Sequence, residues 1–207
     1  RDVERSRGLG DVYKRQPQGV LCVLKQFHYN IEEMLRDKAP LFLLLENIQD
    51  PGNLGTMLRT GEGAGVSGII MSRDTVDLYN PKVIRSTMGS IYRVPFYYAD
   101  DFAAAVHQVQ QAGVSVYAAH LRGKNSYACQ DYTKGTAFLI GNEGNGLREE
   151  TAELADCYIR IPMEGKVESL NAAVASSILM YEAHRQRAMI ETVSYTHLRA
   201  HETSLHL

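Results

Sequence analysis

Three apolar runs in this chain are each followed by a polar loop containing Gly or Asn and then by a helix-forming stretch. The runs and their loops are Leu41–Leu45 with residues 46–53, Ala137–Ile140 with residues 141–146, and Tyr158–Ile161 with residues 162–168. Short apolar runs that alternate with helices predict an α/β fold, with a mostly parallel sheet covered by helices on both faces. Ligands of such sheets bind beyond the carboxyl ends of the strands, so the three loops predict one composite site.

The third unit gives the most detailed local prediction. Pro162 cannot donate to a strand ladder and so ends the strand, and Ser169 is placed to cap the helix that follows. The apolar face of that helix is formed by Leu170, Val174, Ile178 and Tyr181. Residues 172–177 are mostly Ala and Ser, which are small enough for another backbone to come close. The pattern alone fits an ordinary strand–helix unit as well as a ligand site.

The remaining segments alternate between helix and strand patterns. The expected helices are Asn30–Lys38, Leu54–Ala64, Pro81–Ser90, Asp100–Gln111 and Leu147–Leu154, and the expected strands are Ser67–Met71, Ile91–Phe96 and Val114–Ala119. In the second helix, Leu54, Met57, Leu58 and Gly61 share one face, and Arg59 falls roughly opposite it.

Both ends of the chain correspond to translated DNA adapter. Residues 6–16, SRGLGDVYKRQ, match a transposon-type sequencing adapter, and residues 193–203, VSYTHLRAHET, match its reverse complement in another frame. We therefore expect residues 1–16 and 193–207 to be artefactual tails, which are excluded from fold reasoning. Residues 17–192 are expected to form one domain, with a linker and entry helix over residues 17–40.

Charge and composition limit the classes of function. Without the tails, 16 of the 22 basic and 20 of the 24 acidic side chains remain, a formal charge of −4. This balance argues against a large nucleic-acid surface, so any nucleic-acid binding would be local. Cys22, Cys129 and Cys157 lack metal-ligand spacing and fit a reduced cytoplasm better than a disulfide framework. No apolar run reaches membrane-spanning length. We expect a cytoplasmic protein without metal or membrane partners.

The loops alone leave their chemistry open. Residues 141–146, GNEGNG, have neither the Walker nor the dinucleotide spacing, and a plain turn remains an alternative. Arg59 is either a solvated helix residue or a cation near phosphate or a developing oxyanion. Glu143 could cap the helix that follows it. The histidines are scattered, so no catalytic triad or metal set emerges.

Together, three blocks resemble the three motifs of the SpoU family of RNA ribose methyltransferases, in the SPOUT class. The blocks are ENIQDPGNLGTMLRTGEGAGV with Asn53 and Arg59, LIGNEGNGL with Gly141 and Glu143, and IRIPMEGKVESLNAAVASSILMYE with Ser169, Leu170 and Asn171. Their order and spacing agree with the family, and the similarity spans nearly all of residues 17–187.

The resemblance implies a sheet whose C-terminal segment threads into a deep trefoil knot, a rare exception to the unknotted rule. It implies S-adenosylmethionine as the cofactor, contacted largely through backbone atoms at Leu121, Gly141, Ile161 and Leu170. It also implies that Arg59 helps a ribose 2′-hydroxyl to lose its proton. The other implied catalytic residues, which would position substrate and loop, are Asn53, Glu143, Ser169 and Asn171.

The resemblance further implies the substrate and partners. The expected reaction is ribose 2′-O-methylation of structured RNA, and large-subunit (23S) ribosomal RNA is favoured over transfer RNA. Residues 17–20 resemble the linker of two-domain members, which implies a preceding RNA-binding domain. The small-residue face of residues 172–177 favours a homodimer, unless it packs within the chain. A catalytically silent RNA- or cofactor-binding paralogue, a transfer-RNA enzyme and a nucleotide-phosphate enzyme remain alternatives.

Overall fold

Seven strands form one sheet within residues 25–203, the part of the chain that the computed structural model describes, with side chains to residue 190. The strand order is β3-β2-β1-β6-β4-β7-β5, and all neighbours are parallel. The strands are β1 (Leu41–Leu45), β2 (Gly68–Ser72), β3 (Phe96–Ala99), β4 (Ser115–Ala119), β5 (Asn125–Ser126), β6 (Thr136–Ile140) and β7 (Cys157–Arg160).

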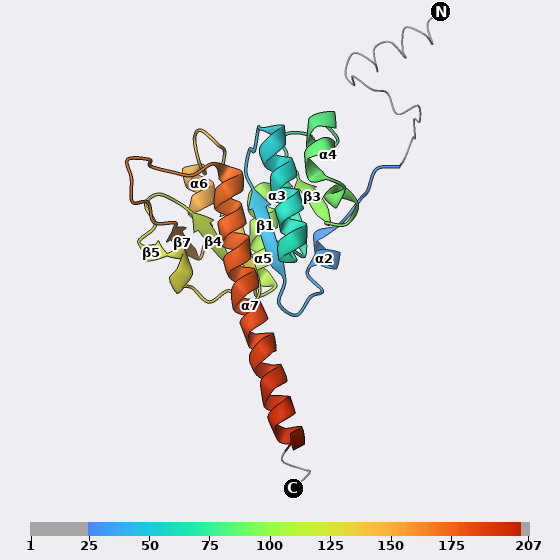
Figure 1. Ribbon diagram of the computed structural model, residues 1–207. Helices are drawn as coiled ribbons and strands as arrows, with labels where there is room; N and C mark the ends of the chain where they lie inside the picture. Colours follow the sequence, from blue (N-terminus) through green and yellow to red (C-terminus); the bar gives the residue numbers. More distant parts are fainter. Residues whose placement is uncertain (1–24, 204–207) are drawn as a thin grey trace, which may run out of the picture.

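Helices cover both faces of this sheet (Figure 1). The helices are α2 (Ile31–Met34), α3 (Pro51–Ala64), α4 (Pro81–Thr87), α5 (Phe102–Gln111), α6 (Glu149–Ala152) and α7 (Ala172–Thr203), with 3-10 turns η1 (Ser90–Tyr92) and η2 (Tyr127–Cys129). Side chains from α3, α4 and α7 enter the core on one face, and those from α2, α5 and α6 enter it on the other. The expected α/β class with a mostly parallel sheet is confirmed.

Strand β1 lies in the middle of the sheet and is buried along its full length. Leu41, Leu43 and Leu45 join the core beneath α3 and α7, whereas Phe42 and Leu44 join the core beneath α5. Alternate side chains of a strand point to opposite faces, so a strand covered on both sides has to be apolar throughout. The run LFLLL therefore specifies a central parallel strand.

The expected strand over Ile91–Phe96 is wrong. Residues 90–92 form η1, and β3 begins only at Phe96. Pro95 lies within the run and cannot donate a ladder hydrogen bond, although its carbonyl accepts one from Ile69 N at 2.9 Å. Ile91 is buried, so the apolar character of this run reflects core packing and not strand structure.

Helix α3 starts at Pro51, earlier than expected, because Asp50 caps it. Asp50 Oδ1 accepts a hydrogen bond from Asn53 N at 2.8 Å, and proline is well tolerated in the first turn, where its missing N–H is not needed. The expected buried face of this helix is confirmed. Helices α4 and α6 are both shorter than expected, and α4 ends before Met88, whose φ of 51° leaves helical geometry.

Helix α7 begins at Ala172 and is capped by Asn171, so the expected cap at Ser169 is wrong. Asn171 Oδ1 accepts hydrogen bonds from Ala173 N at 2.9 Å and from Val174 N at 3.3 Å. Ser169 is exposed in the preceding loop. The amide side chain two residues later satisfies the free N–H groups of the first turn, as a capping residue does.

The small-residue face of α7 is its buried face, and the expected apolar face is wrong. The buried positions are Ala172, Ala173, Ser176, Leu179, Met180 and Ala183. In contrast, Val174 is 48% exposed and Tyr181 is 50% exposed. Ser177 Oγ donates to Thr60 Oγ1 of α3 at 3.3 Å, and Figure 1 shows the two helices side by side. Residues 172–177 therefore pack within the chain, and their small side chains are no longer a reason to expect a dimer.

The chain crosses back over the sheet between β7 and α7. Strand β7 lies next to the edge strand β5, yet α7 packs near the middle of the sheet, against α3 and β6. The deep trefoil knot implied by the resemblance requires this crossing to thread through a loop, and the knot stays a prediction. Among the described helices, none is long and apolar enough to cross a bilayer.

We expect that deleting residues 1–16 and 193–207 changes neither stability nor cofactor affinity. Residues 1–16 lie outside the described part of the chain, and α7 continues to Thr203. Arg187 fastens α7 to the domain by donating to the carbonyls of Ala39 (2.8 Å), Tyr132 (2.9 Å) and Lys134 (2.7 Å). The deletion leaves these bonds intact. The melting temperature and calorimetric affinity of residues 17–192, measured against the full chain, check this, and a large loss in either contradicts an adapter origin.

Candidate functional site

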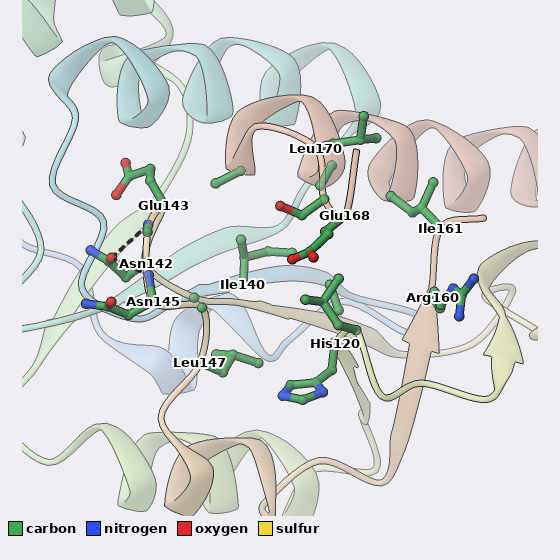
Figure 2. Close-up of a pocket in the computed structure, with 18 of the residues that line it drawn as sticks. His120, Ile140, Asn142, Glu143, Asn145, Leu147, Arg160, Ile161, Glu168 and Leu170 are labelled. Carbon is green, nitrogen blue, oxygen red and sulfur yellow. Dashed lines mark hydrogen bonds between the residues drawn. The ribbon is translucent and has the colours of Figure 1, made fainter. Parts of the chain in front are cut away.

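A cavity of about 240 Å³ opens at the carboxyl ends of β4, β6 and β7 (Figure 2). Ala118 pairs with Leu139 and Ala119 with Ile159, so these strands end at nearly the same level. The walls are residues 119–121 after β4, residues 140–147 after β6, residues 159–161 and Met163 after β7, and residues 168–170, Ala172 and Ala175 at the start of α7. Two of the three predicted loops thus form the cavity, and the loop after β1 lies beside it.

Gly141 is the residue on which the loop after β6 depends. A Cβ at Gly141 would lie 2.2 Å from both the Gly146 carbonyl carbon and Leu147 N, which are backbone atoms. The loop closes tightly because Asn142 N donates to Gly146 O at 3.0 Å and Gly146 N donates to Asn142 O at 2.9 Å. Gly146 has φ +71°, in the left-handed region. The glycines are therefore needed for the shape of the cavity wall.

Asn142 fixes this loop to the loop after β1. Its Oδ1 accepts hydrogen bonds from Gly144 N at 3.0 Å and from Asn145 N at 3.1 Å, which makes an Asx turn. Its Nδ2 donates to Asn47 O at 2.8 Å. Asn47 itself has φ 54°, a left-handed conformation that Asn tolerates better than most residues.

Glu143 joins the second motif to the first. Its carboxylate accepts hydrogen bonds from Gln49 N at 3.1 Å, Asp50 N at 3.0 Å and Asn53 Nδ2 at 3.0 Å. Burial raises the pKa of Glu143, but the bonds from Asn53 and the two backbone N–H groups outweigh burial and bring the pKa below its usual value. The side chain is therefore ionised at neutral pH and acts only as an acceptor.

Asn53 extends this hydrogen-bond network to the third motif. Its Oδ1 accepts a hydrogen bond from Asn171 Nδ2 at 3.0 Å. Glu143, Asn53 and Asn171 thus form one hydrogen-bonded chain that links three segments far apart in the sequence. Because Asn171 also caps α7, this chain fixes the start of α7 relative to the two loops.

The residues that the resemblance assigns to the cofactor all lie around the cavity. Leu121, Gly141, Ile161 and Leu170 are among its walls, and Ser169 is as well. Leu121 is 58% exposed, at the outer end of β4. Gly141 directly follows β6, Ile161 directly follows β7, and Leu170 lies just before α7. The fold thereby brings together residues that are up to 49 positions apart in the chain, from Leu121 to Leu170.

Three of the implied catalytic residues do not wall the cavity: Arg59, Asn53 and Asn171. Asn53 and Asn171 are linked to the cavity wall through Glu143, whereas Arg59 is not. It is exposed on α3 and is absent from the cavity walls. Among the described residues it has no hydrogen bond or ion pair. It follows Asn53, the residue of α3 that belongs to the hydrogen-bonded chain, by almost two helical turns. Its guanidinium is free to reach a ligand or another molecule.

A buried carboxylate beside the site was missed by the sequence reasoning. Glu46 is only 1% exposed and accepts hydrogen bonds from Arg148 N at 2.8 Å and from the Thr151 hydroxyl. Arg148 also pairs with Asp74, which raises the pKa of the guanidinium. These bonds fix the base of the loop after β6. The available signal was a charged residue directly after the apolar run of β1, since an isolated buried charge is costly.

Glu168 is a second residue that was not singled out. It lies in the loop between β7 and α7, and Figure 2 shows its side chain within the cavity. Its carboxylate has no hydrogen bond or ion pair among the described residues. A free carboxylate close to apolar walls such as Ile140 and Ile161 favours a ligand that carries positive charge.

Comparison with known proteins agrees with these features. Residues 40–181 match the family described as SpoU rRNA Methylase. The chain is 32% identical over 191 residues to the 23S rRNA (guanosine-2'-O-)-methyltransferase RlmB of Ralstonia nicotianae, over 91% of this chain and 77% of that protein. It is 37% identical over 139 residues to the 23S rRNA (guanosine(2553)-2'-O)-methyltransferase RlmP of Bacillus subtilis, over 67% and 56%.

The fold also matches a solved structure with a bound ligand. The SpoU methyltransferase AviRb from Streptomyces viridochromogenes, in complex with the cofactor AdoMet, aligns with a TM-score of 0.72 and 31% identity. The alignment covers 77% of this chain and 62% of AviRb. The chain thus spans from 56% of RlmP to 77% of RlmB, and about three fifths of AviRb.

Proposed function

The chain belongs to the SpoU rRNA methylase family, and from this premise we propose that it transfers a methyl group from S-adenosylmethionine to a ribose 2′-hydroxyl of large-subunit ribosomal RNA. One observation carries the proposal: the four residues assigned to the cofactor wall a single cavity at the carboxyl ends of three strands. The names of RlmB and RlmP support ribosomal RNA as the substrate class.

The chemistry of the cavity fits S-adenosylmethionine. When bound, this cofactor supplies an electrophilic methyl group on a positively charged sulfonium. Ile140, Ile159 and Leu170 offer apolar surface to its uncharged part, and backbone groups of residues 141–147 are available for its polar edges. The Glu168 carboxylate would balance the positive charge, since opposite charges attract strongly in a partly desolvated cavity.

The role proposed for Arg59 is to activate the nucleophile, which is the ribose 2′-hydroxyl. A ribose hydroxyl is too weak an acid to be a good nucleophile at neutral pH, so its proton has to pass to solvent as its oxygen takes the methyl group from the sulfonium. A nearby guanidinium favours the alkoxide by its charge and can hold phosphate and ribose oxygens together with its planar fork. Ser169, at the cavity wall, and the chain of Glu143, Asn53 and Asn171 would position the substrate and the loops.

We propose a homodimer in which Arg59 of one copy serves the cavity of the other. Arg59 is exposed and lies outside the cavity of its own chain. Val174, Ile178 and Tyr181 form a partly exposed apolar stripe along α7, and Tyr181 Oη lies 3.0 Å from where a Cβ on Gly63 of α3 would be. A contiguous apolar stripe beside an unpaired cation suits a symmetric contact between two copies.

We expect the double substitution Val174→Glu and Tyr181→Glu to convert a dimer into a monomer, because two charges per copy would be desolvated at the interface. Light scattering at roughly 50 µM protein measures the molecular mass, in a range where ordinary interfaces stay associated. Met88→Glu, at a 69% exposed side chain just after α4, is the matched control and should stay dimeric. A monomeric wild-type chain would contradict the dimer.

The proposed function is tested in two steps. Calorimetry should show binding of S-adenosylmethionine and competition by S-adenosylhomocysteine but not by ATP; the opposite preference would favour a nucleotide-phosphate enzyme. Labelled cofactor, total RNA from a strain lacking the modification and nuclease digestion then locate the methyl group. Label on a base overturns the assignment, and label confined to transfer RNA selects that alternative. Cofactor binding without transfer to any RNA supports a silent paralogue.

The proposed partners are structured RNA and a second copy of the chain, and the proposed location is the cytoplasm. The RNA partner and the location rest on the RNA substrate named for the relatives, and the second copy rests on the exposed stripe of α7 and on Arg59. Within residues 25–190, no group of three His, Cys, Asp or Glu side chains is arranged to hold a metal ion. The transfer step proposed here uses charge and orientation from the chain's own residues.

A further inference from the structure

We infer that a second cavity, next to the cofactor cavity, is a seat for backbone phosphates of the RNA substrate. It measures about 470 Å³ and is formed by residues 121–126 with Arg160 and Pro162. Leu121 and Arg160 wall both cavities, so a ligand in the second lies directly beside the site of methyl transfer. The inference rests on the proposed function, because it takes RNA as the substrate.

The walls of this second cavity carry three cations and no carboxylate. The cations are Arg122, Lys124 and Arg160, and all three are exposed. The guanidinium of Arg122 already donates a hydrogen bond from Nη2 to Glu149 Oε1 on α6, at 2.6 Å, and Glu153 attracts it electrostatically. The side chains of Lys124 and Arg160 have no hydrogen bond or ion pair among the described residues. Two cations are therefore available to an anionic ligand.

The backbone holds these cations on a fixed frame. Gly123 N donates to His120 O at 2.9 Å, and a Cβ at Gly123 would lie 2.8 Å from the carbonyl carbon of Ile159. Only glycine allows the loop after β4 to lie this close to β7. Strand β5 then pairs with the end of β7, with Ser126 opposite Arg160. Figure 2 shows Arg160 at the end of β7, across the cavity from Asn142 and Asn145.

Phosphodiester is the anion that best fits this position. Each ribose of an RNA strand is flanked by phosphates, so a ribose placed at the methyl donor brings a phosphate close to the adjoining cavity. An arginine fork and a lysine point charge both bind phosphate oxygens, and such contacts fix register without reading sequence. The full chain has a net charge of −2, so this pair of free cations beside the site is a local feature. Lys124 and Arg160 are therefore positioning residues.

The test compares Lys124→Ala with Lys38→Ala in the full chain. Lys38 is exposed just before β1, at the amino ends of the strands and away from both cavities. Its replacement by Ala removes the same charge as Lys124→Ala. The probe is a fluorescein-labelled, mixed-sequence RNA of about 20 nucleotides, titrated at several salt concentrations. Losing one phosphate contact should lower the slope of log K against log salt by about 0.7 for Lys124→Ala, and adding Arg160→Ala should roughly double that change.

Arg160→Lys should retain the salt slope, and Lys124→Ala should bind S-adenosylmethionine as the wild type does. An unchanged slope, or an equal loss in Lys38→Ala, overturns the inference. The inference is also overturned if the wild-type chain binds no RNA, or if its second cavity binds inorganic tripolyphosphate more tightly than it binds the RNA. Calorimetry with the cofactor is independent of these results, so failure of the phosphate seat is distinguished from failure of the proposed methyltransferase function.

Discussion

Arg59→Ala is expected to lower the rate of methyl transfer by about 10³-fold, at the upper end of the loss typical when one group that stabilises a developing oxyanion is removed. That change corresponds to about 4 kcal/mol of transition-state stabilisation. Affinity for S-adenosylmethionine should stay within about twofold, because Arg59 is exposed on α3 and does not wall the cavity. Single-turnover transfer from labelled cofactor gives the rate, and calorimetry gives the affinity.

Two companion variants separate charge from geometry. Arg59→Lys retains the positive charge but not the planar fork, so an intermediate rate is expected. Arg36→Ala removes another exposed arginine, near the amino end of β1, and should leave the rate unchanged. Transfer by Arg59→Ala at a rate near that of the wild type would remove Arg59 from the mechanism.

Mixing two inactive variants tests whether Arg59 acts on the other copy. Arg59→Ala has an intact cavity, and Gly141→Ala has an intact Arg59. If Arg59 serves the partner's cavity, each mixed dimer contains one complete site, and random exchange should restore roughly a quarter of wild-type activity. If Arg59 acts within its own chain, mixing restores nothing.

Gly141→Ala is expected to weaken cofactor binding by about 100-fold, which corresponds to about 2.7 kcal/mol. The added Cβ would lie 2.2 Å from two backbone atoms, so no side-chain rotation relieves the clash. The loop has to open and break the paired hydrogen bonds between Asn142 and Gly146. Overpacking of this kind costs about 1–3 kcal/mol of stability. Cofactor calorimetry and denaturant unfolding measure the two losses.

Gly144→Ala is the matched control in the same loop. A Cβ there would meet only Asn142 Oδ1, at 3.6 Å, which is ordinary contact, and Gly144 is not among the glycines with positive φ. Cofactor affinity and stability should therefore stay close to those of the wild type. If the two variants behaved alike, the tight closure at Gly141 would not be what shapes the cavity.

The strands that the sequence predicted well are the ones whose pattern has a single physical explanation. Leu41–Leu45 has the bounds expected of it, because a run of five apolar residues fits only a strand covered on both faces. The prediction of a strand over Ile91–Phe96, the run that contains Pro95, was wrong, because a mixed apolar pattern there fits a 3-10 turn and a core contact equally well. Local pattern decides structure only where one environment explains it.

For the site, the sequence supplied the loops and the motif residues but not their connections. Gly141, Leu121, Ile161 and Leu170 were assigned through family resemblance, and they share one cavity because three parallel strands end at the same level. Glu168 and the buried Glu46 were missed, since a carboxylate in a sequence gives no sign of whether it faces water or a cavity.

The amino-acid sequence by itself determined the alternation of strands and helices and the glycine-dependent loops, because these follow from local sterics and burial. Tertiary structure decided which face of α7 is buried. Val174 and Tyr181 are the more apolar choice, yet the Ala and Ser face packs on α3, since small side chains let two helix backbones approach closely. Tertiary structure also placed β6 between β1 and β4, which brings Glu143 to Asn53 and leaves Arg59 outside its own cavity.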